Sequence, residues 1–467
     1  MLQCEECVDK NRVCRLSYQA IASCNRLGLN PMITAKKILV LCPTKREYRD
    51  LPALAQALDC ELVFDDFCGD YFDLFLGKNP RTDLPHLDIL SLIEETVARH
   101  RRSGICGVTS GVGYPGMSAA SIIAKRLGLP GPSPESVICC EHKYYSRVAQ
   151  KQFVPHAVPS FYLLDSANAE AIREIATFPV FLKPVKSCMS INAHRVYDQE
   201  QLRGIAKSSL MPAGFVRPFD DMLRAYTNYP LHASYLLVES LLEGSQVSLE
   251  GYVFGGRIQV MGVLDAILFP GTISFKRFQY PSCLNDDVQD RMKNIAQCFL
   301  AGIGYDNAPF NIEMFYDARA DSIQIIEVNP KIASQFSDLF MKVDGQSSFS
   351  ALLQIALGEE PAFRKRKGDF KIAASCVLRT FADQRVLGIP STESIRELES
   401  QYPDALIEIH AIPGMNLSDQ MQDAQSFRYG LINIGADSES ELERKFAHIQ
   451  SRLDFQVAPA RAGGAAR

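Results

Sequence analysis

The sequence lacks any apolar run of the roughly 18 residues that a helix needs to cross a bilayer. Its first residues, MLQCEECVDKNR, carry acids where a secretory signal peptide would have positive charge followed by an apolar core. The chain also has no internal repeat and no low-complexity segment. These absences argue against membrane-spanning and secreted proteins, and we expect a cytoplasmic protein without membrane contacts.

An excess of positive charge is missing as well. The formal net charge is −5 and the sequence pI is about 6.0, so the charge balance does not predict a nucleic-acid surface. The 467 residues are 47% hydrophobic and 22% charged, which is an ordinary soluble globular composition. A chain of this length predicts about three domains with enough material for buried cores.

Cysteines are numerous but mostly isolated. Among the 14 cysteines, Cys42, Cys106 and Cys298 stand singly in apolar segments, which favours reduced, buried small hydrophobes. The exception is the N-terminal set, which opens with Cys4 and Cys7 and continues with a second pair separated by nine residues. A zinc site is one interpretation of this set, but the wide second spacing favours reduced thiols on an amphipathic segment.

The first half of the chain predicts a parallel α/β unit. The segment KKILVLC (36–42) predicts a buried strand, Lys45 to Leu58 a helix, and CELVF a second strand. A second strand, turn and helix follow in GICGVTSGVGYPGMSAASIIAKRLGLPG, where the helix stops at Gly128. The turn TSGVGYPG lies beyond a strand's carboxyl end, where open sheets bind ligands. It lacks the G-x-G-x-x-G spacing of a dinucleotide fingerprint, and a purely structural turn is the alternative.

From about Glu141 the pattern changes to strands separated by longer helices. The preceding helix begins at SPES, with Ser133 as N-cap and Pro134 at the first helical position. A charged linker, GEEPAFRKRKGDF, surrounds Pro361. Beyond it, KIAASCVLRTFA, LIEIHAIPG and FRYGLINIGA predict an antiparallel sheet, and SESELERKFAHIQSRL predicts a final helix.

The stretch FNIEMFYDARADSIQIIEVNPK (310–331) predicts two short strands joined by a turn. With the hairpin centred near Ala320, Glu313 lies opposite Glu327, and Asn329 shares a face with Glu327. Opposed carboxylates repel each other unless a proton or a cation lies between them. Two carboxylates and an amide oxygen suit Mg²⁺, which prefers hard oxygens and usually shares them with phosphates. A solvated hairpin face with ordinary surface acids is the alternative.

Two lysines precede this hairpin. Lys143 follows a capped helix start in CEHKYYSR, and Lys183 ends the apolar strand FPVFLK immediately before Pro184. The strand YLLVES then runs into LLEG. A lysine at a strand end is usually a solvated edge residue. In this order, however, the lysines, the strand and the two acids strongly resemble the ATP-grasp ligases, over about residues 36 to 460.

The resemblance implies an ATP-grasp fold of mixed α/β and α+β class, closest in layout to the L-amino-acid and dipeptide ligases. It implies four segments: an N-terminal extension (1–35), a parallel pre-ATP-grasp α/β domain (36–140), an ATP-grasp domain (141–360) whose small subdomain ends near 238, and a C-terminal antiparallel lid domain (361–460).

The resemblance also assigns binding positions. It implies ATP as a bound nucleotide, with Mg²⁺ (or Mn²⁺) at the hairpin. Backbone groups suit adenine because its edge offers one donor beside one acceptor, which the free edge of a strand can mirror. The matching residues are Lys143 and Lys183 for the phosphates, Glu239 with the backbone of Ser240 and Leu242 for adenine, and Glu313, Glu327 and Asn329 for the metal ions.

Three features depart from the family pattern. The phosphate-covering loop, KPVKSCMSINAH, has no glycine, although Ser187, Ser190 and Asn192 could present donors to phosphate. Gln246 stands where a ribose-binding Glu is usual, and its amide oxygen can still accept from a hydroxyl. Lys331 replaces an Arg two residues after the metal-binding Asn, which keeps the charge but loses the bidentate fork.

The implied activity is that of an ADP-forming carboxylate–amine ligase that acts through an acyl phosphate on small-molecule substrates. Lys331 would stabilise negative charge at the acyl carbon. Lys276 or Arg277, in the lysine- and aromatic-rich loop GTISFKRFQYPS, would reach the γ-phosphate on closure, and a solvated basic loop is the alternative.

Two alternatives to this ligase stay open. One is a biotin-carboxylase-type enzyme of the same family, and the other is a catalytically weak ATP-binding regulatory protein, which the departures in the loop would favour. The sequence does not name the carboxylate or the amine, and it leaves a homodimer open.

Overall fold

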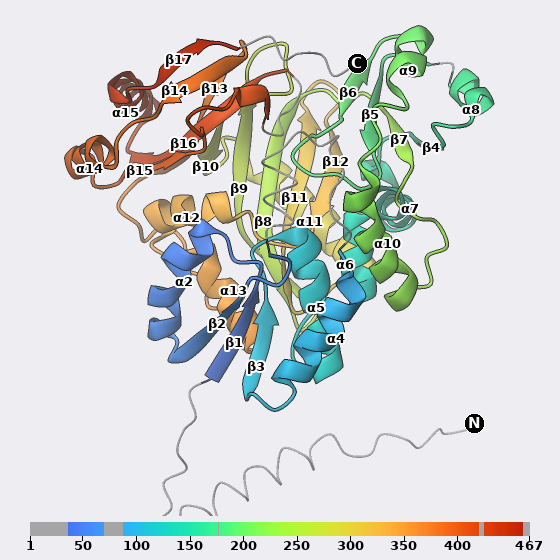
Figure 1. The fold of residues 1–467 in the computed structure, drawn as a ribbon, viewed down its shortest axis with the longest axis horizontal. Helices are drawn as coiled ribbons and strands as arrows, with labels where there is room; N and C mark the ends of the chain where they lie inside the picture. Colours follow the sequence, from blue (N-terminus) through green and yellow to red (C-terminus); the bar gives the residue numbers. More distant parts are fainter. Residues whose placement is uncertain (1–35, 70–86, 176, 420–424, 461–467) are drawn as a thin grey trace, which may run out of the picture.

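The computed structural model describes residues 36–69, 87–175, 177–419 and 425–460. The N-terminal cysteine set that opens with Cys4 and Cys7 lies outside these residues. Within the described part of the chain, no helix combines the length and the apolar character that crossing a membrane requires. The fold rests on a parallel sheet, a small antiparallel sheet and a large antiparallel sheet (Figure 1).

The N-terminal unit is a three-stranded parallel sheet in the order β2-β1-β3. Alternation along β1 turns Ile38 and Val40 toward α2 and α13, while Leu39 and Leu41 pack with α4 and α5. The predicted parallel α/β organisation is therefore confirmed. The elements are β1 (Lys36–Leu41), α2 (Lys45–Ala57), β2 (Cys60–Asp65), α4 (Ile89–His100), β3 (Ile105–Thr109), the turn η1 (Gly113–Met117) and α5 (Ser118–Leu127).

Two helices lead into a four-stranded antiparallel sheet of order β4-β7-β5-β6. The first helix begins as predicted, because Ser133 Oγ accepts from the backbone N–H of Ser136 at 3.1 Å and Pro134 takes the first helical position. The elements are α6 (Pro134–Glu141), α7 (Lys143–Phe153), η2 (Pro155–Ala157), β4 (Phe161–Leu164), α8 (Ala169–Glu174), β5 (Val180–Pro184), β6 (His194–Val196), α9 (Gln199–Ile205), α10 (Ala213–Tyr226) and β7 (Leu236–Ser240).

An eight-stranded antiparallel sheet of order β12-β11-β8-β9-β10-β13-β16-β15 spans the middle of the molecule. The predicted C-terminal strands are present, but β13 pairs with β10, so they extend the preceding sheet instead of forming one of their own. The elements of this region are β8 (Ser245–Phe254), β9 (Arg257–Leu268), β10 (Phe275–Tyr280), α11 (Asp286–Gly302), β11 (Ala308–Asp317), β12 (Ser322–Asn329), η3 (Ser334–Phe336), α12 (Ser337–Asp344), α13 (Ser348–Ala356), β13 (Ile372–Thr380), β15 (Leu406–Ile409) and β16 (Phe427–Ala436).

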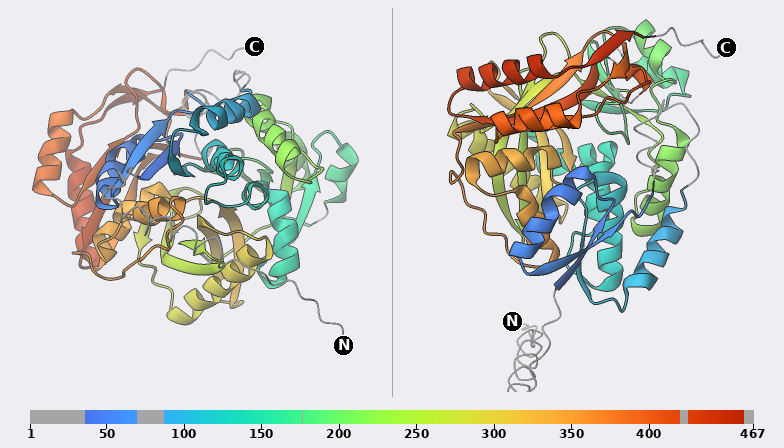
Figure 2. Two further views of the ribbon diagram at one scale, coloured as in Figure 1. Left: turned by 90° about the horizontal axis from the view of Figure 1, so that it is seen from below. Right: turned by 60° about the vertical axis from the view of Figure 1, so that its left-hand side comes forward.

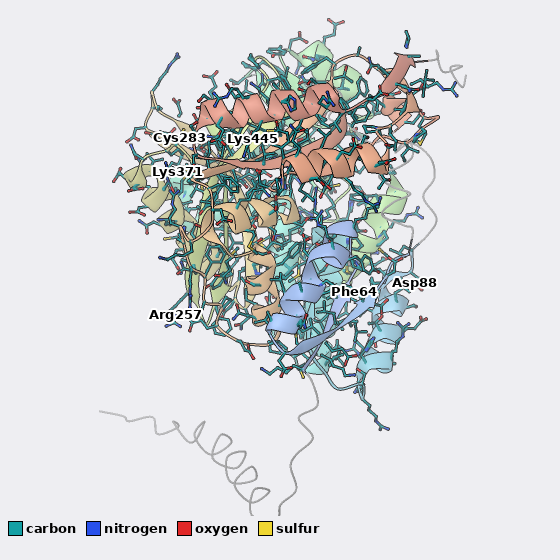
Figure 3. The ribbon with its side chains drawn as sticks, turned by 90° about the vertical axis from the view of Figure 1, so that its left-hand side faces the viewer. Phe64, Asp88, Arg257, Cys283, Lys371 and Lys445 are labelled. Atoms are coloured by element: carbon teal, nitrogen blue, oxygen red, sulfur yellow. The ribbon has the colours of Figure 1, made fainter. Side chains whose placement is uncertain are left out.

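Two helices cover one face of the C-terminal strands (Figure 2). Leu398, Leu442 and Ile449 are buried there. Lys445, labelled in Figure 3, donates to the carbonyl of Gly435 at 2.9 Å and thereby ties its helix to β16. The remaining elements are β14 (Gln384–Gly388), α14 (Thr392–Gln401), η4 (Leu417–Asp419), α15 (Glu439–Arg452) and β17 (Gln456–Pro459), with β14 and β17 paired.

Helix α13 joins the parallel unit to the large sheet. Its Phe349, Leu352 and Leu353 are buried against the face of β1 that also carries α2. The approach to β3 is so close that a Cβ at Gly107 would lie 2.2 Å from the carbonyl oxygen of Ala356. A glycine is therefore required at this contact for steric reasons.

We predict that Gly107→Ala lowers the free energy of unfolding by about 1–3 kcal/mol, because the new methyl group pushes β3 away from the backbone of α13. Gly204→Ala is the control, since Gly204 lies in α9 and a methyl group added there would meet nothing within 4 Å. Alanine favours a helix over glycine by about 0.5–1 kcal/mol, so this control is expected to stabilise. Urea denaturation of both variants tests the contact, and equal stabilities would contradict it.

Candidate active site

The two predicted acids face each other in the hairpin of β11 and β12. The register pairs Glu313 with Glu327 and Asn311 with Asn329, so the predicted opposition of the acids is confirmed. Both carboxylates are partly buried, and β12 is the edge strand of the large sheet. The acids therefore meet at an accessible edge instead of inside the sheet.

The two acids differ in their affinity for a proton. Burial and the charge of Glu327 raise the pKa of Glu313 to about 7. Burial acts in the same direction on Glu327, but the ammonium groups of Lys143 and Lys183 outweigh it and lower the pKa of Glu327 to about 2. Opposed oxygen donors that concentrate negative charge fit a hard divalent cation such as Mg²⁺ or Mn²⁺, with the amide of Asn329 as a third donor.

Lys143 opens α7 beside this pair. Its Nζ lies 3.2 Å from Glu327 Oε2 and donates to the carbonyl of Ser187 at 3.1 Å, so it connects the acids with the start of the phosphate loop. Arg147 follows one helical turn later on the same face of α7. The four-residue spacing of the two cations is the signal in the sequence that points to Arg147.

Lys183 shares both of its partners with Arg147. Lys183 Nζ lies 2.8 Å from Glu239 Oε2 and 3.3 Å from the carbonyl oxygen of Ile326. Arg147 donates to Glu239 Oε1 at 2.6 Å and to the same carbonyl at 2.7 Å. Its third bond goes to Gln150 Oε1 at 2.5 Å, and the side chain is almost fully buried.

A β-bulge makes the shared carbonyl available. Glu313 pairs with Glu327 and Met314 with Ile325, so Ile326 is an extra residue in β12. Because β12 is an edge strand, this carbonyl can accept from two cations on the neighbouring elements. The predicted hairpin did not include the bulge.

The predicted adenine-binding positions lie at the end of β7. The expectation of a free strand edge is wrong at Ser240, because β7 lies between β4 and β5 and the Ser240 N–H donates to the carbonyl of Ser160 at 2.9 Å. The carboxylate of Glu239 is buried and held by two cations. Leu242 follows the strand in a segment without regular secondary structure and stays a candidate.

The side chains of the phosphate loop bond mainly within the loop and its surroundings. Ser187 Oγ donates to the carbonyl of Ile191 at 2.8 Å, and Asn192 Nδ2 donates to the carbonyl of Leu210 at 3.2 Å. The expected role of these two side chains as phosphate donors would thus require them to exchange partners.

The backbone of this loop adopts conformations that usually require glycine. Met189, Ser190 and Asn192 have φ angles of 51°, 58° and 58°. For residues with a Cβ the left-handed region costs roughly 1–2 kcal/mol each, less for Asn. The loop therefore reaches left-handed turns without the glycine that the family pattern supplies.

The predicted ribose position contacts the acid pair. Gln246 in β8 donates from Nε2 to Glu313 Oε2 at 3.1 Å, which leaves the expected acceptor, its amide oxygen, out of that bond. Two residues of the same strand face, Ser248 and Glu250, contact Asn311 through its Nδ2 at 2.8 and 3.1 Å. Alternation along β8 places Ser248 and Glu250 on the same face as Gln246, so the sequence pattern could have indicated that they lie near the hairpin.

Glu250 also holds the segment that carries Lys331. Glu250 is fully buried, burial raises its pKa to about 7, and its Oε2 accepts from the backbone N–H of Ala333 at 2.8 Å. Lys331 Nζ donates to the carbonyl of Ile332 at 3.3 Å. The backbone after Asn329 is therefore fixed by a buried carboxylate that the sequence did not identify.

The glycine-rich turn TSGVGYPG reaches the same place. A Cβ at Gly113 would lie 3.2 Å from Glu141 Oε1 and 3.4 Å from Lys331 Cδ, so glycine keeps the space between these side chains. Lys186 at the root of the phosphate loop lies 3.2 Å from Glu141 Oε2 and 4.6 Å from the ring centroid of Tyr114. The parallel unit thus contacts the root of this loop through the ring of Tyr114, and α6 contacts it through the buried ion pair of Glu141.

Residues 176–338 match the family model of the ATP-grasp domain. The chain contains an ATP-grasp domain. The matched segment includes Lys183, the strand β7, the acids Glu313 and Glu327, and Lys331. The predicted ATP-grasp domain is therefore confirmed over these residues.

Similar proteins support the same fold. The uncharacterized protein y4rH of Sinorhizobium fredii is 24% identical over 367 residues, which are 76% of this chain and 66% of that protein, so the chain spans just under two thirds of its relative. The L-amino acid ligase of Bacillus licheniformis has a TM-score of 0.65 at 15% identity, covering 91% of this chain and 99% of that one. A β-γ-ATP complex of biotin carboxylase from Campylobacter jejuni has a TM-score of 0.59 at 14% identity, covering 91% and 93%.

These similarities confirm the predicted ATP-grasp fold, with its parallel N-terminal sheet and antiparallel sheets. The division into domains and the roles of individual residues stay predictions.

In the structure, the side chain of Arg277 has acidic partners on α15 and is not free to meet a nucleotide without exchanging them. The supposed loop around it is largely strand β10, and the buried Arg277 guanidinium forms ion pairs with Glu439 and, at 3.2 Å, with Glu443. Both acids lie on α15, a helix outside the ATP-grasp segment. Neighbouring strand residues point to opposite faces, and the exposed Lys276 stays a candidate.

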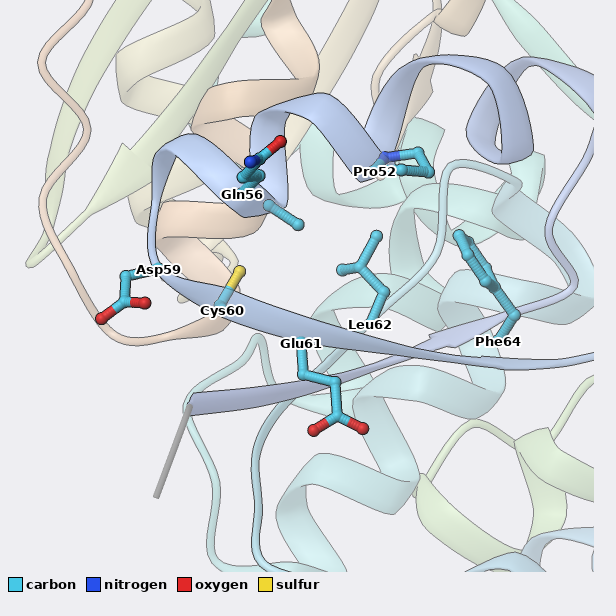
Figure 4. A pocket seen from close by; sticks show the side chains of 8 residues that line it. Pro52, Gln56, Asp59, Cys60, Glu61, Leu62 and Phe64 are labelled. Atoms are coloured by element: carbon cyan, nitrogen blue, oxygen red, sulfur yellow. The ribbon is translucent and has the colours of Figure 1, made fainter. Parts of the chain in front are cut away.

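Other candidate sites fit the ATP-grasp ligand less well. A surface pocket of about 510 Å³ lies between α2 and β2 (Figure 4). Its lining residues include no lysine or arginine that could bind a triphosphate, and β2 is an edge strand of the parallel sheet. Among the residues that the structure describes, no cluster of three or more His, Cys, Asp or Glu side chains is arranged to hold a metal. A metal at the hairpin would therefore depend on two acids and an amide.

We predict that Arg277→Met lowers the free energy of unfolding by about 1–2 kcal/mol, because it removes charge-assisted bonds to α15, and leaves ATP affinity unchanged. Thermal denaturation and titration calorimetry measure the two effects. Lys276→Met is the comparison, since it should change stability little. A large loss of ATP affinity in Arg277→Met at unchanged stability would contradict the placement of Arg277.

Proposed function

We propose that the protein is an ATP-dependent, ADP-forming carboxylate–amine ligase that joins an amino acid or small carboxylic acid to an amine or a second amino acid. The observation that carries this proposal is the opposition of Glu313 and Glu327 with Lys143 and Lys183 beside Glu327. Opposed acids bordered by lysines suit a triphosphate with its cations, whereas an ordinary surface hairpin would place such acids apart in solvent.

The chain's own residues would bind and orient ATP. Lys143 and Lys183 would contact the phosphates, and their charges act strongly because both side chains are largely removed from water. Leu242 would meet adenine through its backbone, and the amide oxygen of Gln246 would accept from the ribose. The loop with Ser190 would cover the phosphates on closure.

Glu313, Glu327 and Asn329 would hold Mg²⁺ or Mn²⁺. Such an ion neutralises phosphate charge and polarises phosphoryl oxygens when it is bound.

The reaction follows from positioning and charge. A carboxylate oxygen of the substrate attacks the γ-phosphorus, the bond from that phosphorus to the bridging oxygen breaks, and ADP leaves. The amine nitrogen then attacks the acyl carbon, phosphate leaves, and the nitrogen loses a proton. Lys331 would stabilise the negative charge that develops at the acyl carbon, and Lys276 would reach the γ-phosphate.

The biotin-carboxylase alternative has support from the similar fold of the Campylobacter jejuni enzyme. A phosphate-release screen over a pairwise amino-acid library separates the two enzymes, because only the ligase is expected to respond. Bicarbonate with biotin is the opposite arm. ATP binding without phosphate release in either arm would favour the catalytically weak regulatory protein. Under the ligase proposal the partners are small molecules and the location is the cytoplasm.

We predict that Glu327→Gln lowers turnover by two or more orders of magnitude, or about 3 kcal/mol on the barrier, because it removes charge from the cation site without changing shape. Glu397→Gln on the exposed face of α14 is the matched control and should be fully active. Steady-state ADP production checks both variants. Turnover near that of the unmodified protein in Glu327→Gln would exclude the metal assignment.

We predict that Lys183→Met weakens ATP binding about 10-fold or more, because a charge-assisted hydrogen bond contributes about 1.5–3 kcal/mol. It should also lower the melting temperature, since Glu239 loses one of its two buried partners. Calorimetry below the transition separates the two effects. If Lys183→Met and the unmodified protein bind ATP equally well, Lys183 has only a structural role.

A further inference from the structure

Arg147, Lys183 and Glu239 form a buried group in which two cations share one carboxylate. The exposed fraction of these residues is 2% for Arg147, 5% for Lys183 and 3% for Glu239. Each cation takes one oxygen of the carboxylate, Arg147 at 2.6 Å and Lys183 at 2.8 Å. Both also donate to the carbonyl of Ile326. The group comes from α7, β5, β7 and the bulge in β12.

The formal charge of this group is not balanced. Two positive charges and one negative charge leave one positive charge in a region nearly closed to water, where charge interactions are strong. Arg147 is the less adaptable cation, because each of its three guanidinium nitrogens already donates to a protein acceptor, in Glu239, Gln150 or Ile326. The ammonium group of Lys183, in contrast, has three N–H donors but only two acceptor partners here, Glu239 and the carbonyl of Ile326.

The environment keeps Glu239 ionised. Burial alone would raise the pKa of this carboxyl, but Arg147 and Lys183 together lower it. Burial lowers the pKa of Lys183 to about 8, which leaves the ammonium charged at neutral pH. The count of one surplus positive charge therefore applies near neutral pH.

We infer that Arg147 is a positioning residue that neutralises Glu239 and holds the carbonyl of Ile326, so that the charge of Lys183 remains available to a bound triphosphate. This inference rests on the proposed function, in which Lys183 contacts phosphates. In this inference Arg147 acts through Lys183 and not by direct contact with the nucleotide, since it is almost fully buried and each of its nitrogens donates to a protein acceptor. Without Arg147, Glu239 would cancel the charge of Lys183.

Charge counting gives a distinct expectation for each variant. Arg147→Met leaves a net charge of zero in the group, while the double variant Arg147→Met with Glu239→Gln restores one positive charge. Arg147→Lys keeps the charge but loses the fork, and Glu239→Gln alone raises the surplus. We therefore expect Arg147→Met to bind ATP at least 10-fold more weakly than the unmodified protein, and the double variant to bind it about as well. We expect the affinity of Arg147→Lys to stay within about threefold, and Glu239→Gln alone to bind ATP more tightly.

The experiment measures dissociation constants for ATP and for inorganic triphosphate, each with Mg²⁺, by calorimetry on the full chain. Inorganic triphosphate isolates the phosphate contribution, because it has no adenine to meet β7. Arg277→Met is the matched control, a buried arginine with two carboxylate partners on α15. Circular dichroism at the working temperature confirms that each variant is folded.

Restoration of both affinities by Glu239→Gln in the Arg147→Met background would support the inference, since loss of fold stability would not be repaired in this way. Equal binding by Arg147→Met and the unmodified protein would overturn it, as would a double variant as weak as Arg147→Met. If Arg147→Met does not fold, Glu239→Gln and Arg147→Lys decide, and weaker binding by Glu239→Gln overturns the inference. If the unmodified protein binds neither ligand, the proposed function fails first.

Discussion

The opposition of Glu313 and Glu327 across one hairpin is the constraint on which the site depends. Two facing carboxylates repel each other, and partial burial strengthens the repulsion because water cannot screen it fully. Positive charge offsets this repulsion only at Glu327, whose pKa Lys143 and Lys183 lower. Glu313 has the neutral amide of Gln246 beside it, and its pKa is raised. That asymmetry leaves oxygen donors directed at a common space, which is the arrangement a hard cation requires.

Lys143 and Lys183 lie beside the acid pair, and other buried groups hold Lys183 in place. The bulge at Ile326 turns a backbone carbonyl toward α7 and β5, and Glu239 accepts from both Arg147 and Lys183. A buried carboxylate with a single partner would be costly, and a buried cation without one equally so. Helix α7, strands β5 and β7 and the edge strand β12 are therefore joined through one ionic group.

The loop KPVKSCMSINAH contains left-handed backbone conformations although it has no glycine. In a loop that is usually glycine-rich in the family, Met189, Ser190 and Asn192 adopt left-handed backbone conformations, and Asn192 Nδ2 donates to the carbonyl of Leu210. Lys186 at the loop's root forms a buried ion pair with Glu141. Local contacts of Ser187 and Asn192 accompany these left-handed conformations, and closure over phosphates would require those contacts to change.

The sequence by itself indicated the parallel α/β unit, the later strands and the opposition of the two acids, because alternation, capping and spacing are local properties. The ATP-grasp fold and the interest of Lys143 and Lys183 came from the resemblance to that family. The sequence did not determine that the C-terminal strands extend the large sheet, that Arg277 faces α15, or that Arg147, Glu239 and Glu250 are buried partners of the site. Those outcomes depend on which edges pair and which faces are covered, and such contacts join residues far apart in the chain. Strand periodicity gives the face of a residue relative to its neighbours, but only the packed structure decides what lies against that face.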